Sequence, residues 1–310
     1  MADGRFAPSP SGDLHLGNLR TALLAWLFAR SSGGRFLVRV EDLDERARHP
    51  EIERAQLDDL SALGLSSDET PVRQSERLDR YQDAIATLVA TGLTYECTCT
   101  RREIREAASA PHGEAPEGSY PGTCLRLGAA ERARRSGEGR PPALRLHTEV
   151  DRLAIDDRIH GRYEGAVDDV VLRRNDGLPA YNLAVVVDDA DQGIDEVVRG
   201  DDLLPSTPRQ AHLADLLALP RVTYAHVPLV LGPDGERMAK RHGSVTLGDQ
   251  WNAGRSPAAV LALLGDSLGL CDQRARAELA DLLVAFDPDD LPRDAWTVSR
   301  QTLSDGPGAT

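Results

Sequence analysis

The sequence is poor in several residue types. Only one of its 36 basic residues is a lysine, it has two methionines and four cysteines, and aromatic residues make up 4% of its 310 positions. No stretch approaches the roughly 18 consecutive apolar residues of a membrane-spanning helix, and the first residues lack the basic and apolar regions of an export signal. Three of the cysteines are clustered, whereas a secreted disulfide framework needs distributed pairs. We therefore expect a cytoplasmic globular protein without a membrane anchor.

An excess of negative charge limits the partners that the chain can bind over a large surface. The chain has 50 acidic against 36 basic residues, which gives a formal net charge of -14. Binding nucleic acid along a broad basic face depends on many phosphate contacts, so this composition argues against an extended footprint but allows a small one. With 41% hydrophobic residues, the chain can fill the core of one large domain or two ordinary ones.

The single lysine stands close to the only methionine inside the chain. Met238 and Lys240 both lie in the glycine-bearing segment GPDGERMAKRHG. Where arginine has replaced almost every lysine, a retained lysine suggests a task for a compact, flexible ammonium group. A mobile loop of this kind can bring a point charge to a phosphate, although the segment does not match a Walker A loop. The alternative is that two rare residues meet by chance on a solvated loop.

The hydrophobic pattern predicts alternating strands and helices. Residues 3–9 indicate a strand that stops at the first prolines, residues 16–30 a helix, and FLVRVED the next strand. This order opens a parallel doubly wound α/β sheet, whose ligand crevice lies at the carboxyl ends of its strands. The further elements that we predict are two helices within 50–92, strands at 180–189 and 194–200, a helix at 210–220, a strand at 223–232 and a helical tail over 256–303.

The turn after the first strand has the composition of an anion site. In PSPSGDLHLGN, Gly12 and Gly17 let the backbone approach a ligand, and His15 stands at the mouth of the helix, where backbone amides attract phosphate. Glycines before helices are common, so the motif alone is a weak signal. Its position directly after the first strand favours a site for ATP phosphates.

A cysteine cluster predicts a metal site in an inserted segment. Cys97 and Cys99 are followed, after about 20 residues, by Tyr120 and then by Cys124 in a turn with proline and glycine. Three thiolates with one oxygen or nitrogen ligand suit tetrahedral zinc, and a closed site of this kind is structural. Either Tyr120 or His112 can supply the fourth ligand.

Two short segments together carry a family resemblance. HLGN and RMAKR resemble, in the expected order, the HIGH and KMSKS signatures of class I aminoacyl-tRNA synthetases. The segments RFAPSPSG, VED and YNLAVVVDD are similar to the glutamyl branch of that class. The resemblance implies a Rossmann-like catalytic domain with His15 and Lys240 as catalytic residues. The ATP-binding residues that it implies are Gly12, His15, Gly17, Asn18, Met238 and Lys240. The glutamate-binding residues that it implies are Arg5, Ser9, Glu41, Tyr181 and Arg199.

This resemblance has exceptions and an alternative. Asn18 stands where HIGH ends in histidine, and Ala239 replaces the serine of KMSKS. Both departures affect the contacts that the resemblance implies to the ribose and phosphates of ATP, but they do not affect the predicted fold. The alternative for the charged members of the glutamate set, Arg5, Glu41 and Arg199, is that they form surface ion pairs.

Within the glutamyl branch, the chain resembles the shortened glutamyl-queuosine tRNA(Asp) synthetases. Only about 65 residues follow the Lys240 loop, so we expect no anticodon-binding domain. The resemblance implies that a cytoplasmic monomer activates L-glutamate with ATP and Mg²⁺ in the absence of tRNA. It then implies transfer to queuosine in the anticodon stem-loop of tRNA(Asp), with Tyr120 as the fourth ligand of a structural zinc. The alternatives are an anticodon-less glutamyl-tRNA synthetase that charges a tRNA 3′ end, and a non-catalytic tRNA-binding regulator.

The resemblance also implies a division into four segments. Residues 1–95 and 165–235 are expected to form the two halves of the catalytic domain. Between them, residues 96–164 form an inserted zinc-bearing subdomain on the acceptor side. Residues 236–310 carry the KMSKS-like loop and a helical subdomain.

Overall fold

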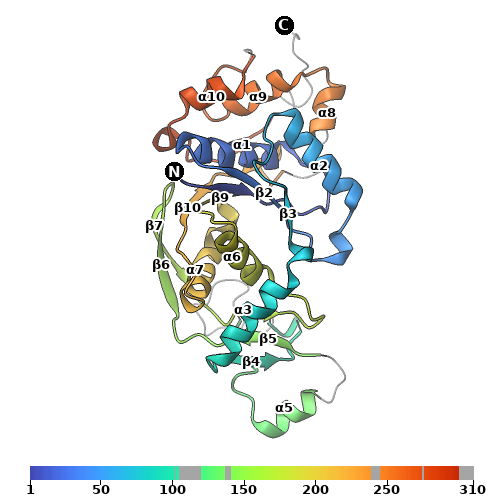
Figure 1. Cartoon of the computed structure of the whole chain (residues 1–310), viewed down its shortest axis with the longest axis vertical. Coiled ribbons are helices and arrows are strands. Elements are labelled where there is room, and N and C mark those ends of the chain that lie inside the picture. The colour runs from blue at the N-terminus through green and yellow to red at the C-terminus, as the bar shows by residue number, and fades with distance from the viewer. Residues whose placement is uncertain (101, 105–119, 137–140, 239–244, 274–275, 300–310) are drawn as a thin grey trace.

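A seven-stranded sheet organises the structure, a computed structural model that describes residues 1–100, 102–104, 120–136, 141–238, 245–273 and 276–299 (Figure 1). The strand order is β3-β2-β1-β9-β10-β6-β7. Neighbouring strands are parallel from β3 to β6, and β7 is antiparallel to β6. The strands are β1 (Gly4–Phe6), β2 (Phe36–Val40), β3 (Val72–Arg73), β6 (Arg152–Asp157), β7 (Gly161–Ala166), β9 (Glu196–Gly200) and β10 (Thr223–Val227).

The strand order reverses between β1 and β9. From β1 the chain adds β2 and β3 on one side, whereas β9 is followed by β10 on the other side. The two strands are direct neighbours, with Gly4 opposite Glu196. Such a reversal opens a crevice at the carboxyl ends of the strands, where doubly wound sheets bind ligands. The predicted α/β doubly wound sheet is therefore confirmed.

Helices cover both faces of the sheet (Figure 1). Helix α1 (Leu16–Ser31) lies on one face with the C-terminal helices beyond it, and α6 (Tyr181–Asp191) and α7 (Thr207–Leu216) lie on the other. Strand β2 is buried at every position, including Arg39, and its other four residues are apolar, as is typical of a strand covered on both faces. The other helices are α2 (Pro50–Ala62), α3 (Leu78–Ala90), α5 (Ala129–Ser136), α8 (Leu247–Asn252), α9 (Pro257–Asp266) and α10 (Leu279–Ala285). Short 3₁₀ turns are η1 (Glu45–Ala47), η2 (Gln74–Glu76), η3 (Asp201–Ser206) and η5 (Pro288–Asp290).

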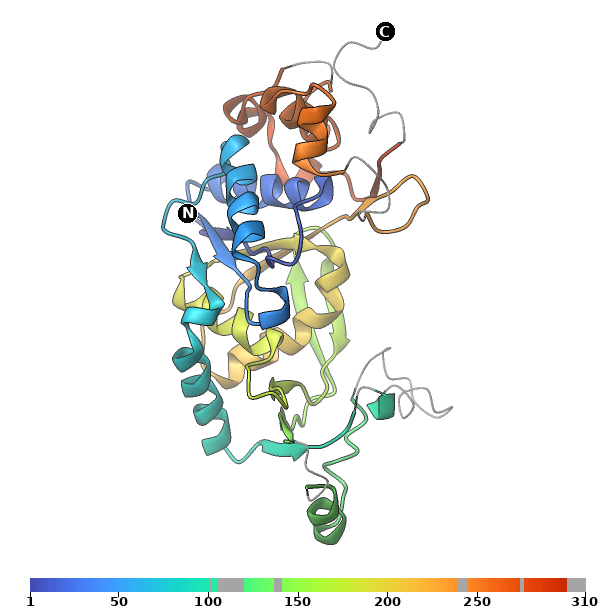
Figure 2. The same ribbon diagram turned by 90° about the vertical axis from the view of Figure 1, so that its right-hand side faces the viewer.

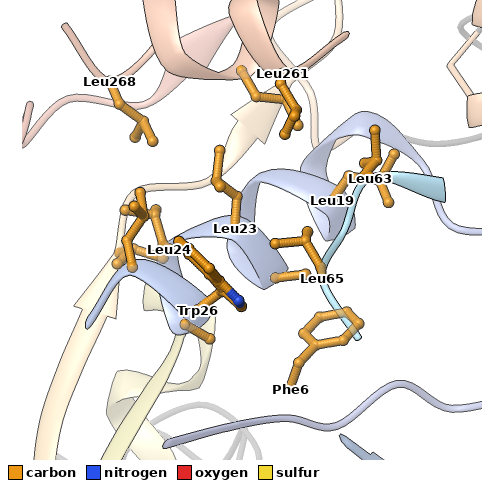
Figure 3. Packing of buried hydrophobic residues seen from close by; sticks show 14 of the residues in the cluster. Phe6, Leu19, Leu23, Leu24, Trp26, Leu63, Leu65, Leu261 and Leu268 are labelled. Carbon is orange, nitrogen blue, oxygen red and sulfur yellow. The ribbon is translucent and has the colours of Figure 1, made fainter. Parts of the chain in front are cut away.

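The main core joins α1 to the C-terminal helices. Leu19 and Leu23 of α1 share one cluster with Leu261 and Leu268 from the tail (Figure 3). Burial of a leucine side chain contributes about 1.5–3 kcal/mol relative to its exposure, so these contacts fix the tail on the catalytic domain. None of the described helices has the length and apolarity to cross a membrane.

The strand predicted at residues 180–189 is wrong, because this segment forms helix α6. Leu183 to Val187 are consecutive apolar residues, and all of them are buried. Helix α6 packs against α3 and α7, so apolar residues occupy several of its faces. A fully buried helix and a fully buried strand both give an unbroken apolar run, and periodicity cannot distinguish them.

The C-terminal part of the fold also corrects two predictions. The strand predicted at 223–232 is divided into β10 and β11 (Val230–Leu231), with Pro228 between them. Proline cannot donate a ladder hydrogen bond, which is consistent with a break there. Strand β11 pairs in parallel with β12 (Trp296–Thr297), inside the tail that we predicted to be helical. The local sequence pattern does not predict β12, because this short strand depends on its tertiary pairing with β11.

Part of the inserted segment, together with neighbouring residues, forms a separate layer at the opposite end of the molecule from the C-terminal helices (Figures 1 and 2). Its sheet has the order β4-β5-β8, with β4 (Thr94–Cys97), β5 (Ala143–Leu146) and β8 (Val171–Arg173). The hairpin of β6 and β7 lies between β5 and β8 in the sequence but joins the main sheet through β10. The segment 96–164 therefore contributes to both sheets.

Candidate active site

A cavity of about 410 Å³ lies at the reversal point, where β1 and β9 end. Seven of the predicted ligand-binding residues line this cavity, although they come from distant parts of the sequence. They are Arg5, His15, Gly17, Asn18, Glu41, Tyr181 and Arg199. The structure therefore brings together the residues assigned to ATP and those assigned to glutamate. Their roles in binding stay predictions.

Three further predicted residues in the described part of the chain, Ser9, Gly12 and Met238, are not among those that line the cavity. Ser9 is exposed, and its carbonyl oxygen, like that of Gly12, accepts a hydrogen bond from Gln56 Nε2. Met238 is only 4% exposed and packs in the main core. Lys240 lies outside the described residues, as does Ala239.

The ring of His15 caps the N-terminus of α1. Its Nδ1 accepts hydrogen bonds from the backbone N–H groups of Gly17 and Asn18, at 3.1 and 3.3 Å. Asn18 Oδ1 in turn accepts from His15 N at 3.1 Å, which completes a capping box. Asn18, the residue that departs from the HIGH signature, thus has a helix-capping role. A Cβ atom on Gly17 would lie 2.9 Å from His15 Cε1, so a side chain there would displace the ring.

This capping arrangement also determines the protonation of His15. Burial lowers the pKa of the ring to about 4, and the charge of Arg237 acts in the same direction. The ring is therefore neutral near pH 7. Because Nδ1 accepts hydrogen bonds, the proton resides on Nε2. His15 can accordingly donate one hydrogen bond to an anion while its other nitrogen holds the helix end.

Arg5 belongs to a buried charge network that sequence reasoning missed. Its Nε lies 2.9 Å from Asp189 Oδ1, which also accepts from Arg39 Nη1 at 2.6 Å. Burial alone would raise the pKa of Asp189, but the charges of Arg39 and Arg5 outweigh it and lower the pKa to about 2. Arg5 is only 4% exposed, so its pairing is not the surface ion pair of the alternative interpretation.

Glu41 is one of two acidic residues among the described residues that line the cavity, with Asp202. Its side chain is 11% exposed, and Oε1 lies 3.5 Å from Arg39 Nη2. Burial raises the pKa of Glu41, although the charges of Arg39 and Arg5 oppose the shift. An ammonium group is the ligand that such a carboxylate would prefer. Tyr181, on the first turn of α6, is 41% exposed beside it.

The cysteine cluster lies in the inserted segment, in a geometry that fits a metal ion. The sulfur atoms of Cys97, Cys99 and Cys124 all lie within 4.8 Å of one another. Tyr120 Oη lies 3.4 Å from Cys97 Sγ and 3.6 Å from Cys99 Sγ. In a tetrahedral zinc site with bonds of about 2.3 Å, sulfur atoms are about 3.8 Å apart. The four side chains therefore present a suitable donor set, whereas His112 lies outside the described residues.

A second cavity lies between Tyr120 of the cysteine cluster and Tyr181 of the candidate active site. It has a volume of about 660 Å³, and both Tyr120 and Tyr181 line it. Tyr181 also lines the first cavity, so the two spaces share a wall. The inserted segment thus faces the crevice of the main sheet.

Comparison with known proteins agrees with this architecture. The model of the family "tRNA synthetases class I (E and Q), catalytic domain" matches residues 2–303. The chain belongs to this family. It is therefore an enzyme of the aminoacyl-tRNA synthetase type with a class I catalytic fold.

Several relatives in the family match most of the chain. The glutamyl-Q tRNA(Asp) synthetase of Nocardia farcinica is 66% identical, over 97% of this chain and 94% of the relative. The protein of the same name from Symbiobacterium thermophilum is 46% identical over the whole of both chains. Glutamate–tRNA ligase 1 of Nitrosococcus oceani is 40% identical over 96% of this chain, but over 63% of its own length.

A solved structure has the same fold. The glutamate tRNA ligase of Elizabethkingia meningosepticum, crystallised in complex with its amino acid, superposes with a TM-score of 0.81 at 27% identity. The match covers 97% of this chain and 68% of the ligase. The predicted class I synthetase-type fold is confirmed by this likeness.

Proposed function

We propose that this enzyme activates L-glutamate with ATP, without tRNA, and transfers the glutamyl group to queuosine in the anticodon of tRNA(Asp). The observation that carries the proposal is the extent of the matches. Relatives named glutamyl-Q tRNA(Asp) synthetase match at 66% and 46% identity along 94% and 100% of their lengths. The Nitrosococcus ligase instead matches along 63% of its length.

The cavity supplies groups for the first step. Arg5 and Arg199 suit carboxylates, and Glu41 suits the ammonium group of the amino acid. The α-carboxylate of glutamate attacks the α-phosphorus of ATP in line, and pyrophosphate leaves with Mg²⁺. His15 stabilises the phosphate charge through Nε2–H, and Lys240 supplies a point charge from its loop.

The second step joins the glutamyl group to the acceptor. A hydroxyl of the cyclopentene-diol of queuosine attacks the carbonyl carbon of the mixed anhydride, and AMP leaves. The adenylate phosphate takes the proton from that hydroxyl. We further propose that a cytoplasmic monomer performs both steps and contacts the anticodon stem-loop, because the net charge of -14 suits a small nucleic-acid footprint.

Two assays test this function. ATP–pyrophosphate exchange with glutamate alone should proceed without tRNA, and no exchange would contradict tRNA-free activation. Labelled glutamate should then be transferred to queuosine-containing tRNA(Asp), but not to the same tRNA without queuosine or to tRNA(Glu). Nuclease digestion of the product locates the label. Label on the 3′-terminal adenosine would instead show a glutamyl-tRNA synthetase that charges tRNA ends.

We also propose that Cys97, Cys99, Tyr120 and Cys124 hold one structural zinc. The protein should then bind about one zinc per chain, and Cys124→Ser should abolish this binding because a hydroxyl is a poor zinc ligand. Cys271→Ser is the matched control, since Cys271 lies outside the cluster. Elemental analysis of the purified variants measures the metal. A zinc content of one per chain in Cys124→Ser would contradict the site. If zinc is lost in His112→Ala but not in Tyr120→Phe, His112 and not Tyr120 is the fourth ligand.

A further inference from the structure

Arg199 is held in the cavity wall by neutral partners. Its side chain is 6% exposed, Nε donates to His226 Nε2 at 3.0 Å, and Nη2 donates to Thr207 Oγ1 at 2.8 Å. Within the described part of the chain, no aspartate or glutamate forms an ion pair with Arg199. An arginine this deeply buried usually has a carboxylate partner, because an uncompensated charge is costly to bury.

Asp157 fixes the ring of His226 as an acceptor toward Arg199. His226 Nδ1 lies 2.6 Å from Asp157 Oδ2, and both side chains are fully buried. The backbone N–H groups of Ile159 and His160 also donate to Asp157, at 2.9 and 3.0 Å, so this carboxylate has a fixed orientation. Nδ1 therefore carries the ring proton, and Nε2 is free to accept from the guanidinium group.

Arg5, another arginine that lines the cavity, is in a different electrostatic state from Arg199. The charge of Arg5 is compensated by Asp189, which lies 2.9 Å away and is shared with Arg39. Imidazole and hydroxyl groups orient Arg199, and no carboxylate among the described residues forms an ion pair with it. An anionic ligand can therefore pair with Arg199 without displacing an internal partner, and an uncharged amide cannot supply the missing charge.

We propose that His226, oriented by Asp157, is a positioning residue that aims Arg199 into the cavity and leaves its charge for the side-chain carboxylate of the bound amino acid. The arrangement would make the site prefer glutamate over glutamine. This inference rests on the proposed function, since it assumes that the 410 Å³ cavity receives glutamate. On this proposal His226 and Asp157 contribute to substrate specificity through Arg199, without contacting the ligand themselves.

Two matched pairs of substitutions test the positioning role. His226→Leu removes the acceptor, whereas His226→Gln keeps an oxygen that can reach the position of Nε2. Thr207→Val removes the hydroxyl at nearly constant volume, and Thr207→Ser keeps it. We expect His226→Leu and Thr207→Val to raise the Kd and KM for glutamate about 10- to 100-fold, the range for a hydrogen bond to a charged group. The Gln and Ser variants should recover most of the affinity, and the KM for ATP should change less than about twofold in all four variants.

Equilibrium dialysis with radiolabelled glutamate and glutamine gives the Kd values directly, and pyrophosphate exchange gives the KM values. Selectivity for glutamate should fall in His226→Leu and Thr207→Val. Suppose that the wild type binds glutamate and that His226→Leu and Thr207→Val are folded and bind it equally well. The positioning role of His226 is then wrong, while the proposed function stands. If the wild type binds no glutamate, the proposed function and this inference both fail. Should His226→Leu not fold, the Thr207 pair decides the question alone.

Discussion

Replacing His15 by asparagine will lower the rate of glutamyl-adenylate formation about 100- to 1,000-fold and leave the free energy of unfolding nearly unchanged. The two nitrogens of the ring have separate tasks. Nδ1 caps α1 by accepting from Gly17 N and Asn18 N, whereas Nε2–H remains for the phosphate. Asparagine is among the best N-cap residues, so this variant keeps the cap but loses the donor.

His15→Ala provides the comparison that separates these tasks. Alanine supplies neither the cap nor the donor, so it should lose the same activity and also about 1 kcal/mol of stability. Pyrophosphate exchange measures the first effect, and urea unfolding measures the second. If His15→Asn retains more than about a tenth of the wild-type rate, the ring acts mainly as a helix cap and the catalytic role assigned to it is wrong.

Part of the cavity could be anticipated from the sequence because the turn after the first strand follows a local rule. His15 and Gly17 stand at a strand-to-helix turn, and Arg5 and Arg199 stand in or at the end of apolar strands. Parallel strands bring such positions to one edge of the sheet. Local composition therefore predicted the turn with His15 and Gly17, whereas the family resemblance supplied Arg5 and Arg199, and neither could give the distances between the side chains.

The groups that hold the arginines could not be anticipated in the same way. Arg5 pairs with Asp189 across 184 sequence positions, and His226 pairs with Asp157 across 69. No spacing rule connects such residues, and the strand predicted at 180–189 would have placed Asp189 on the wrong kind of element. The two adjacent aspartates at the end of the apolar run YNLAVVVDD were the available signal. An acidic pair in a buried segment requires cationic partners, and the buried arginines of β1 and β2 supply them.

Asp189→Asn will destabilise the fold by about 3–5 kcal/mol, the cost of removing one partner from a buried ion pair. Asp189 is the shared anion of Arg5 and Arg39, and its side chain is 9% exposed. Asp189 is the anion nearest to the fully buried Arg39, at 2.6 Å from Nη1, whereas Asp188 and Glu41 lie 3.7 Å from Nε and 3.5 Å from Nη2. The amide in the variant keeps the shape of the side chain but removes its charge.

Asp191→Asn is the matched control on the same helix. Asp191 pairs with Arg77 at 2.7 Å, but its side chain is 36% exposed, so solvent screens the pair and its loss should cost less than about 1 kcal/mol. Urea unfolding of both variants at pH 7 measures the difference. Equal effects of the two substitutions would show that the buried network is not a main source of stability.

The pH dependence of the Asp189 effect has a definite sign. The pKa of Asp189 is about 2 in the folded chain, below the value of about 3.9 for an unperturbed aspartate. Its stabilising contribution is therefore complete above about pH 4, and it is lost as the pH falls toward 2 because the unfolded chain takes up the proton at a higher pH than the folded chain does. The stability gap between the wild type and Asp189→Asn should accordingly be constant from pH 5 to 7 and narrow below pH 4. If the difference in the free energy of unfolding between the wild type and Asp189→Asn instead grows below pH 4, groups other than the Asp189 carboxylate provide the stabilisation.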